Sequence, residues 1–146
     1  MTTNTQPRII VVGGGFAGLE SAFLVRAKLG DHADITIVSD SDDFVFKPNT
    51  IYIPFGAKPE KLLIPIARAA AKRNIRFLRA GFESLDPVSR RVRAADWDIP
   101  YDYLVLATGA GMRPEEVPGL AENAETIWTS VAMQRLGIRL SDVAEG

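Results

Sequence analysis

Three glycines near the start of the chain, Gly13, Gly15 and Gly18, follow the spacing G-x-G-x-x-G. In this pattern the first glycine permits a tight turn, the second lets the backbone approach a diphosphate, and the third lets a helix lie close to a strand. A helix that begins here adds N–H groups and the positive end of its dipole, which both attract phosphate. The spacing therefore predicts a pyrophosphate-binding loop. Its residues are Gly13, Gly14, Gly15, Phe16, Ala17 and Gly18.

The segments on either side of this loop give it the context that the motif requires. Arg8 to Val12 is short and continuously apolar, which predicts a buried parallel strand. Phe16 to Leu29 has apolar residues three and four apart, which predicts a helix, and Gly30 is a typical stop signal. Ile35 to Val38 is a second apolar strand. Together these segments predict a β–α–β unit of the size found in nucleotide-binding folds.

The remaining periodic segments complete an α/β fold, in which a parallel sheet carries a small antiparallel insert. Between Ser41 and Pro59, prolines predict a loop, but its many apolar residues indicate that it is packed or lines a ligand site. The expected helices run from Pro65 to about Arg73 and, weakened by Gly137, from Ser130 to Leu140. The expected strands are Ile75 to Leu78, Phe82 to Leu85, Arg90 to Ala94, Trp97 to Ile99 and Tyr103 to Ala107, with a turn at residues 86–89.

Four stretches together resemble one known group of proteins. They are GGGFAGL at 13–19, FVFKPNTIYIPFG at 44–56, the A-T-G of residues 107–109 that ends an apolar strand, and Val117-Pro118-Gly119. The chain up to about Thr129 resembles the two-dinucleotide-binding-domain flavoproteins of the pyridine nucleotide-disulfide oxidoreductase superfamily. Within that superfamily it is most similar to sulfide:quinone oxidoreductases and type II NADH dehydrogenases.

This resemblance implies a Rossmann-like FAD-binding domain with FAD as the cofactor. The implied function is the FAD-binding portion of an oxidoreductase that passes electrons from NADH or sulfide to a quinone. Further FAD-binding residues implied by the family are Lys47, Pro48, Phe82, Ala107, Thr108 and Gly109. Two of these residues have ordinary alternatives, because Lys47 could be a solvated surface lysine and Phe82 a core residue.

The end of the second predicted strand is where dinucleotide folds commonly place an acidic residue that binds ribose hydroxyls. Ser39 occupies that position here and Asp40 follows it. A hydroxyl and a carboxylate suit an unphosphorylated ribose, which argues against NADP, whose 2′-phosphate is typically met by arginine. Alternatively, Asp40 simply begins a polar loop with Asp42 and Asp43.

The chain contains no cysteine, which removes disulfides, cysteine metal sites and thiol catalysis. In many sulfide:quinone oxidoreductases a redox cysteine occupies the position that resembles Trp128 here, so a cysteine persulfide cannot form on this chain. His32, the single histidine, is predicted to lie in a surface loop, and no metal site is expected. No catalytic acid, base or nucleophile is nominated.

The whole sequence of 146 residues fits one domain, and its net charge of −1 gives no indication of nucleic-acid binding. Neither a signal peptide nor a membrane-spanning run is present, which favours a cytoplasmic protein. Basic residues between Arg68 and Arg93 are interpreted as a solvated face.

Members of the resembled families are far longer than this chain. We therefore expect an incomplete domain, the N-terminal part of a larger parent protein associated with the membrane periphery. The missing partners would be C-terminal domains or another copy of the chain, in a dimer or a swapped form. Two other functions remain open: an NAD-binding Rossmann domain, which the A-T-G strand and the antiparallel insert argue against, and a non-catalytic interaction module.

Overall fold

A computed structural model describes residues 6–145 and divides the chain into two compact units. The first unit comprises Met1–Phe44 and Pro65–Gly109. The second comprises Val45–Ile64 and Ala110–Gly146. The glycine-rich loop therefore belongs to the first unit, and the apolar segment that follows Phe44 belongs to the second.

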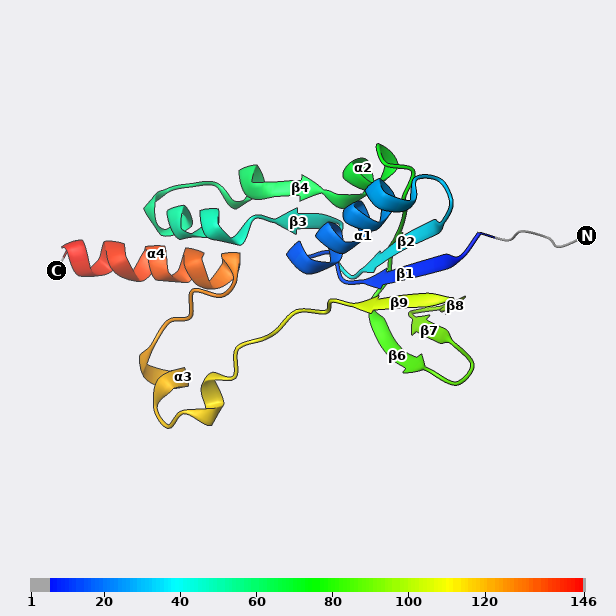
Figure 1. Ribbon diagram of the computed structural model, residues 1–146. Coiled ribbons are helices and arrows are strands. Elements are labelled where there is room, and N and C mark those ends of the chain that lie inside the picture. Colours follow the sequence, from blue (N-terminus) through cyan, green and yellow to red (C-terminus); the bar gives the residue numbers. More distant parts are fainter. Residues whose placement is uncertain (1–5, 146) are drawn as a thin grey trace, which may run out of the picture. The chain divides into compact units, whose positions relative to one another are not determined.

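A four-stranded parallel sheet forms the centre of the first unit, in the order β5-β2-β1-β9 (Figure 1). Helix α1 (Phe16–Leu29) makes the crossover from β1 to β2, as the sequence predicts, and it ends at Gly30 with a φ of 56°. The strands are β1 (Arg8–Val12), β2 (Asp34–Ser39), β5 (Arg76–Arg79) and β9 (Tyr103–Leu106).

Successive side chains of β1 enter two different cores, because neighbouring residues of a strand point to opposite faces of the sheet. Ile9 and Val11 join a cluster with residues of α1 and α2 (Ile66–Ala71). Ile10 and Val12 join a second cluster that includes Val92 and Tyr101. Both faces of the sheet are therefore covered, which explains why β1 is continuously apolar rather than alternating.

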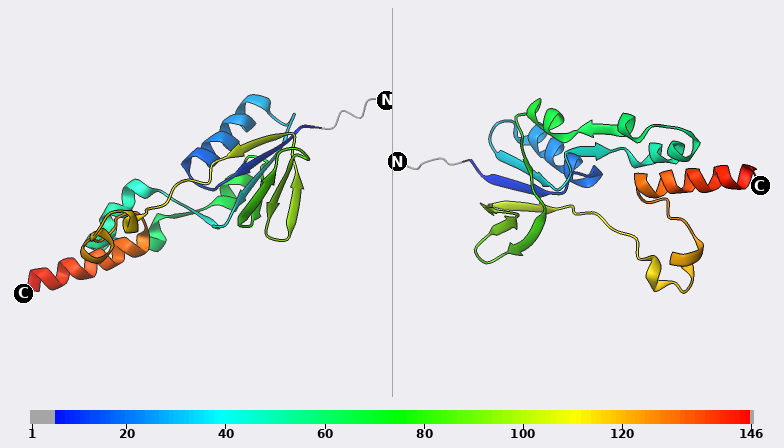
Figure 2. Two further views of the ribbon diagram at one scale, coloured as in Figure 1. Left: turned by 90° about the horizontal axis from the view of Figure 1, so that it is seen from below. Right: turned by 180° about the vertical axis from the view of Figure 1, so that it is seen from behind.

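The covering of the second face is a small antiparallel sheet of three strands, which confirms the predicted insert (Figures 1 and 2). Its strands are β6 (Phe82–Asp86), β7 (Arg91–Ala94) and β8 (Trp97–Pro100). Asp86 accepts hydrogen bonds from the N–H of Val88 and from the N–H and hydroxyl of Ser89, which close the predicted turn. These hydrogen bonds hold the pKa of Asp86 below its ordinary value.

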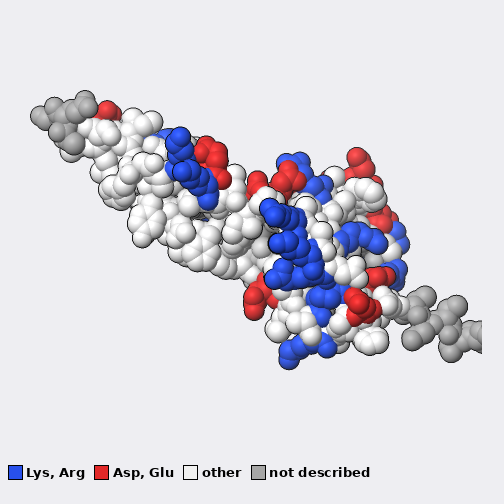
Figure 3. Space-filling view, turned by 90° about the horizontal axis from the view of Figure 1, so that it is seen from above, with Lys and Arg blue, Asp and Glu red and all other residues white. Residues whose placement is uncertain are grey.

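The basic residues of this unit lie on its surface, as the sequence analysis expects. Arg79 pairs with Asp42, Arg91 with Asp98 and Arg93 with Glu83. Their side chains are between 41% and 70% exposed. Figure 3 shows a group of basic side chains on one face of this unit, with acidic side chains around it.

Two predicted segments differ from the structure at their boundaries or in kind. Pro65 does not begin a helix; it is the last residue of β4 (Leu63–Pro65) and caps α2, which stops at Ala71. Asn74, with a φ of 54°, follows in a turn that leads to β5. Residues 41–59 are not simply a loop, because they contain strand β3 (Asp43–Val45), which pairs with β4, and a 3₁₀ helix.

Short helices make up most of the second unit. Prolines stand in the first turn of each 3₁₀ helix, where a missing N–H breaks no helical hydrogen bond. The predicted packing of the segment after Phe44 is confirmed in part: Thr50 and Ile53 are buried, but Phe55 is 79% exposed. The helices are η1 (Lys47–Phe55), η2 (Pro59–Leu62), η3 (Pro114–Glu116), α3 (Leu120–Asn123) and α4 (Ser130–Glu145).

Helix α4 runs beside η1 and continues through Gly137, the residue expected to weaken it (Figure 2). A Cβ atom at Gly137 would lie 3.0 Å from the Cα atom of Pro54 in η1. Glycine therefore lowers the helix propensity at this position, but its lack of a side chain lets the backbones of α4 and η1 come close together. No helix among residues 6–145 is both long and apolar enough to cross a membrane.

An ion pair ties the start of β1 to the residue before β9. Arg8 donates through Nε and Nη2 to the two carboxylate oxygens of Asp102, and the Arg8 backbone N–H donates to Asp102 at 2.7 Å. These hydrogen bonds and the positive charge lower the pKa of Asp102 from 3.8 to about 2. Both side chains are partly exposed, so solvent weakens the pair.

We predict that Asp102→Asn lowers the stability of the chain at pH 7 and matters little at pH 2. Because the pKa of Asp102 is lower in the folded state, its contribution is present above about pH 4 and is lost as the pH falls towards 2. Urea unfolding of both proteins at several pH values checks this. A stability difference that stays constant down to pH 2 would contradict the assignment.

Candidate functional site

The glycine-rich loop connects the end of β1 to the start of α1, beside the ends of β2 and β9. The N–H of Gly13 donates to the carbonyl of Val38 in β2 at 2.8 Å, and the N–H of Ala107 donates to the carbonyl of Val12 at 2.7 Å. These hydrogen bonds continue the parallel ladders past the last paired residues of the strands. The loop is therefore held by backbone contacts on both sides.

Two of the glycines are required by the fold itself. Gly13 has a φ of 119°, a conformation that L-residues with a side chain rarely adopt, and a Cβ atom there would meet the carbonyl of Ala107. A Cβ atom at Gly18 would meet the carbonyl of Gly13. The first turn of α1 thus lies directly on the loop backbone, as the close-packing role of the third glycine requires.

Gly15 differs, because nothing among the described residues 6–145 requires a glycine at this position. Its φ of −85° and ψ of −169° suit any residue, and no heavy atom outside its neighbours lies within 4 Å of a Cβ atom built there. At Gly14, by contrast, a Cβ atom would lie 2.6 Å from the hydroxyl of Ser39 and from Ile66. The open space at Gly15 is what a phosphate-binding loop needs for the close approach of a ligand.

The start of α1 suits an anion. Its N-cap, Gly15, makes no side-chain capping hydrogen bond, and the first turn carries no acidic residue. The first N–H groups of a helix have no partners within the helix, and the dipole makes that end positive. Phe16 lies edge-on against Phe44, with ring centroids 4.9 Å apart, so an aromatic pair lies at the helix start.

Ser39 and Asp40, the residues predicted to bind ribose, have different surroundings. Ser39 is buried, faces the position of Gly14, and its hydroxyl accepts a hydrogen bond from the N–H of Ser41 at 3.2 Å. Asp40 is exposed directly after β2. The geometry therefore gives Ser39 a part in supporting the loop and leaves the Asp40 carboxylate accessible to a hydroxyl group.

The A-T-G segment lies at the same end of the sheet as the glycine loop, because β9 is parallel to β1 and pairs with it. The backbone carbonyl of Ala107 lies directly against Gly13. Thr108 and Gly109 follow it on the surface, and Gly109 has a φ of 80° with open space around it. Three predicted segments, at 13–18, 39–40 and 107–109, thus come together at the carboxyl edge of one sheet, the usual ligand position in such folds.

Comparison with known proteins agrees with this arrangement. Residues 7–142 match the family described as pyridine nucleotide-disulphide oxidoreductase. The chain belongs to this family. The family and its structural neighbours are FAD-binding flavoproteins, which agrees with the expected cofactor.

Individual relatives fall into the two groups that the sequence resembles. A sulfide-quinone reductase of Aquifex aeolicus is 37% identical over 84% of this chain. The external alternative NAD(P)H-ubiquinone oxidoreductase B3 of Arabidopsis thaliana is 26% identical over 99% of it. The solved structure of the A. aeolicus sulfide:quinone oxidoreductase superposes with a TM-score of 0.87 at 31% identity over 96% of this chain. The NDH2 structure from Plasmodium falciparum, at 19% identity and a TM-score of 0.77, shares the fold.

The chain spans only part of the length of these relatives. It covers 28% and 27% of the two curated proteins and 33% of the A. aeolicus structure. The similarity therefore concerns one portion of each relative, the one that contains the glycine-rich loop, and the activity of a whole protein does not follow from it.

In the second unit of this family member, Lys47 lies over the ring of Trp128, with its ammonium nitrogen 3.8 Å from the ring centroid. Lys47 is exposed, as in the surface-lysine alternative, and its ammonium group is held by a cation–π contact. Its role near the cofactor stays a prediction. Pro48 is exposed beside Lys47, in the first turn of η1. The ring of Trp128 therefore positions the Lys47 ammonium group.

Two other residues singled out from the sequence lie on the surface. Phe82 is 37% exposed at the start of β6, so the alternative that it is an ordinary core residue is wrong. Its role in FAD binding stays a prediction. His32 is exposed, as expected. Among residues 6–145, no group of three histidine or acidic side chains could hold a metal ion.

We predict that Gly18→Ala destabilises the chain by about 2 kcal/mol or more, because the new methyl group overlaps the Gly13 carbonyl and the backbone must move. Gly15→Ala is the matched control in the same loop, and we expect its stability to change by less than about 1 kcal/mol. Urea denaturation measures both. Equal stability of the two variants would contradict the inference that the fold requires a glycine at position 18 and not at position 15.

Proposed function

We propose that this chain binds FAD and forms the flavin-binding portion of an oxidoreductase that passes electrons from NADH or sulfide to a quinone. One observation carries the proposal. The fold does not require a glycine at position 15, and the space around Gly15 is open, whereas a bound pyrophosphate would require a residue without a side chain there. The match to the flavoprotein family over residues 7–142 supports FAD in particular.

The residues at the carboxyl edge of the sheet would each bind a different part of the cofactor. The backbone of residues 13–18 and the start of α1 would bind the pyrophosphate. Asp40 would accept hydrogen bonds from the adenosine ribose, with Ser39 holding the loop in place behind it. Thr108 and Gly109 would lie beside the pyrophosphate and the flavin. Bound flavin supplies the redox chemistry, and these residues bind and orient it.

The electron donor is the open part of this proposal. The A. aeolicus relative is a sulfide-quinone reductase, and the A. thaliana relative is an NAD(P)H-ubiquinone oxidoreductase. No thiol of this chain can take part in sulfide oxidation, because the sequence contains no cysteine. We therefore favour NADH as the donor of the whole protein, and association with the periphery of a membrane that holds the quinone acceptor.

We also propose that β9 pairs with a further strand in the working protein, supplied by another segment or another copy of the chain. Within the described residues, β9 is an edge strand that pairs with β1 alone, and Tyr103 and Leu106 are 65% and 53% exposed on it. Uncovered strand edges favour pairing with another strand. Sedimentation that shows a monomer at all concentrations would rule out the second copy.

The proposal is tested by titrating FAD into the purified chain and into Gly15→Val. We expect the chain to bind FAD and the variant to lose at least about tenfold in affinity, because the valine side chain fills the space of the pyrophosphate. Circular dichroism and urea unfolding of Gly15→Val serve as the folding control. If Gly15→Val is folded and keeps its FAD affinity, the loop is not the phosphate site.

A second pair of variants tests the ribose contact. Asp40→Ala should weaken FAD binding by about 1–2 kcal/mol, the size of a hydrogen bond to a charged group. Asp96→Ala, which removes an exposed carboxylate from the turn between β7 and β8, is the matched control and should leave the affinity unchanged. Equal affinities for the Asp40 and Asp96 variants would return Asp40 to the role of a loop residue.

A further inference from the structure

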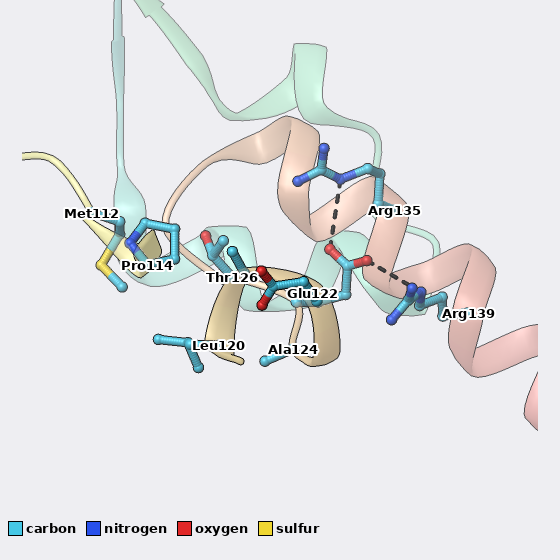
Figure 4. Close-up of a pocket in the computed structure, with 10 residues that line it drawn as sticks. Met112, Pro114, Leu120, Glu122, Ala124, Thr126, Arg135 and Arg139 are labelled. Carbon is cyan, nitrogen blue, oxygen red and sulfur yellow. Dashed lines mark ion pairs between the residues drawn. The ribbon is translucent and has the colours of Figure 1, made fainter. Parts of the chain in front are cut away.

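A pocket of about 350 Å³ lies within the second unit, between α4 and the segment that contains η3 and α3 (Figure 4). This volume is within the range of small-molecule sites. Nothing in the sequence analysis pointed to it, because its residues are spread over 28 positions with no motif. Its lining residues are Met112, Pro114, Leu120, Ala121, Glu122, Ala124, Glu125, Thr126, Arg135 and Arg139.

One wall of the pocket carries two arginines that share a carboxylate. The Nε atom of Arg139 lies 3.2 Å from one oxygen of Glu125, and the Nε atom of Arg135 lies 3.6 Å from the other. The Glu125 side chain is only 16% exposed, whereas the arginine side chains are about 60% exposed. Arg135 and Arg139 are four residues apart on α4 and therefore lie on the same side of the helix (Figure 4).

This arrangement fixes the two guanidinium groups and leaves part of each exposed. An arginine offers five N–H donors in a planar fork that matches a carboxylate. Glu125 faces the Nε side of each group, and within residues 6–145 neither arginine has another acidic partner. The outer N–H groups are therefore available to a second acceptor at the pocket.

The rest of the lining is largely apolar. Met112, Pro114 and Leu120 come from the segment before and within α3, and alanines at 121 and 124 add to them. A ligand of this pocket would therefore need an apolar body as well as an acceptor. The lining holds two arginines and two glutamates, so its formal charge is zero, and the two carboxylates oppose a dianion more than a monoanion.

We propose that this pocket binds an amphipathic monocarboxylate, such as a medium-chain fatty acid. Its carboxylate accepts hydrogen bonds from Arg135 and Arg139 beside Glu125, and its chain covers Met112, Pro114 and Leu120. The glycine-rich loop belongs to the first unit. The residues of the pocket belong entirely to the second unit.

Isothermal titration with decanoate, below the concentration at which it forms micelles, tests the site on the whole 146-residue chain. We expect saturable binding that weakens about tenfold or more in Arg135→Gln/Arg139→Gln, because charge-assisted hydrogen bonds are lost. Glu122→Gln should bind decanoate a few times more tightly, since it removes a repelling charge from the lining. A gain of affinity cannot result from damage to the fold.

Matched controls test whether decanoate binding depends on this site rather than on the overall charge of the protein or the hydrophobicity of the ligand. Lys61→Gln removes a positive charge from the same unit outside the lining and should leave the affinity unchanged. Decanol, which keeps the chain but lacks the carboxylate, should bind at least about tenfold more weakly. The proposal is wrong if decanoate does not bind, if the double arginine variant binds it equally well, or if decanol or inorganic phosphate binds as tightly as decanoate.

Discussion

The contact of the first turn of α1 with the backbone below it is the constraint on which the first unit depends. Gly18 lies against the Gly13 carbonyl, and Gly13 lies against the carbonyl of Ala107. The loop and first turn of α1 thus meet each other and the segment after β9 backbone to backbone, with no room for a side chain between them. This contact fixes where α1 begins, and with it the position of the N–H groups and the dipole that face an anion. The binding loop is a consequence of how tightly the helix is seated, and Gly15 is left open on its outer side.

The two-sided core keeps this contact in place. Alternate residues of β1 and β2 are buried against helices on one face and against the antiparallel sheet on the other. A strand buried on both faces cannot slip by one residue without moving side chains between two differently shaped cores. The register of β1 with β2 and β9 therefore determines that these three strands end at nearly the same level, so that residues 13, 39 and 107 lie at one edge of the sheet. The segments of the candidate site are brought to one edge by strand register rather than by direct contacts among their side chains.

Much of the first unit could be predicted from the sequence, because local patterns there agree with the fold. Arg8 to Val12 and Phe16 to Leu29 were predicted with the bounds that the structure has, since apolar runs and glycine signals mark their ends. The second unit was predicted poorly. Prolines at positions 48 and 59 are typical loop signals, but here they stand in the first turns of 3₁₀ helices. The helix expected from Ser130 is present, and the packing of Gly137 against Pro54, which accounts for a glycine within it, is a contact between distant residues. The cation–π pair of Lys47 and Trp128 could not be foreseen for the same reason, since the two residues are 81 positions apart.

Local rather than global charge governs the candidate nucleotide site. The chain carries a formal net charge of −1, which by itself would slightly oppose a diphosphate. Ionic screening at physiological salt limits such a long-range effect to about 8 Å. At the loop itself the local electrostatics come from backbone N–H donors and the dipole of α1, whose first turn contains no carboxylate. Acidic residues follow β2 instead, where Asp40 is exposed and Asp42 is paired with Arg79. In the proposed binding mode the pyrophosphate would meet the positive end of the α1 dipole and the ribose would meet the Asp40 carboxylate, which would orient the cofactor without any basic side chain in residues 13–18.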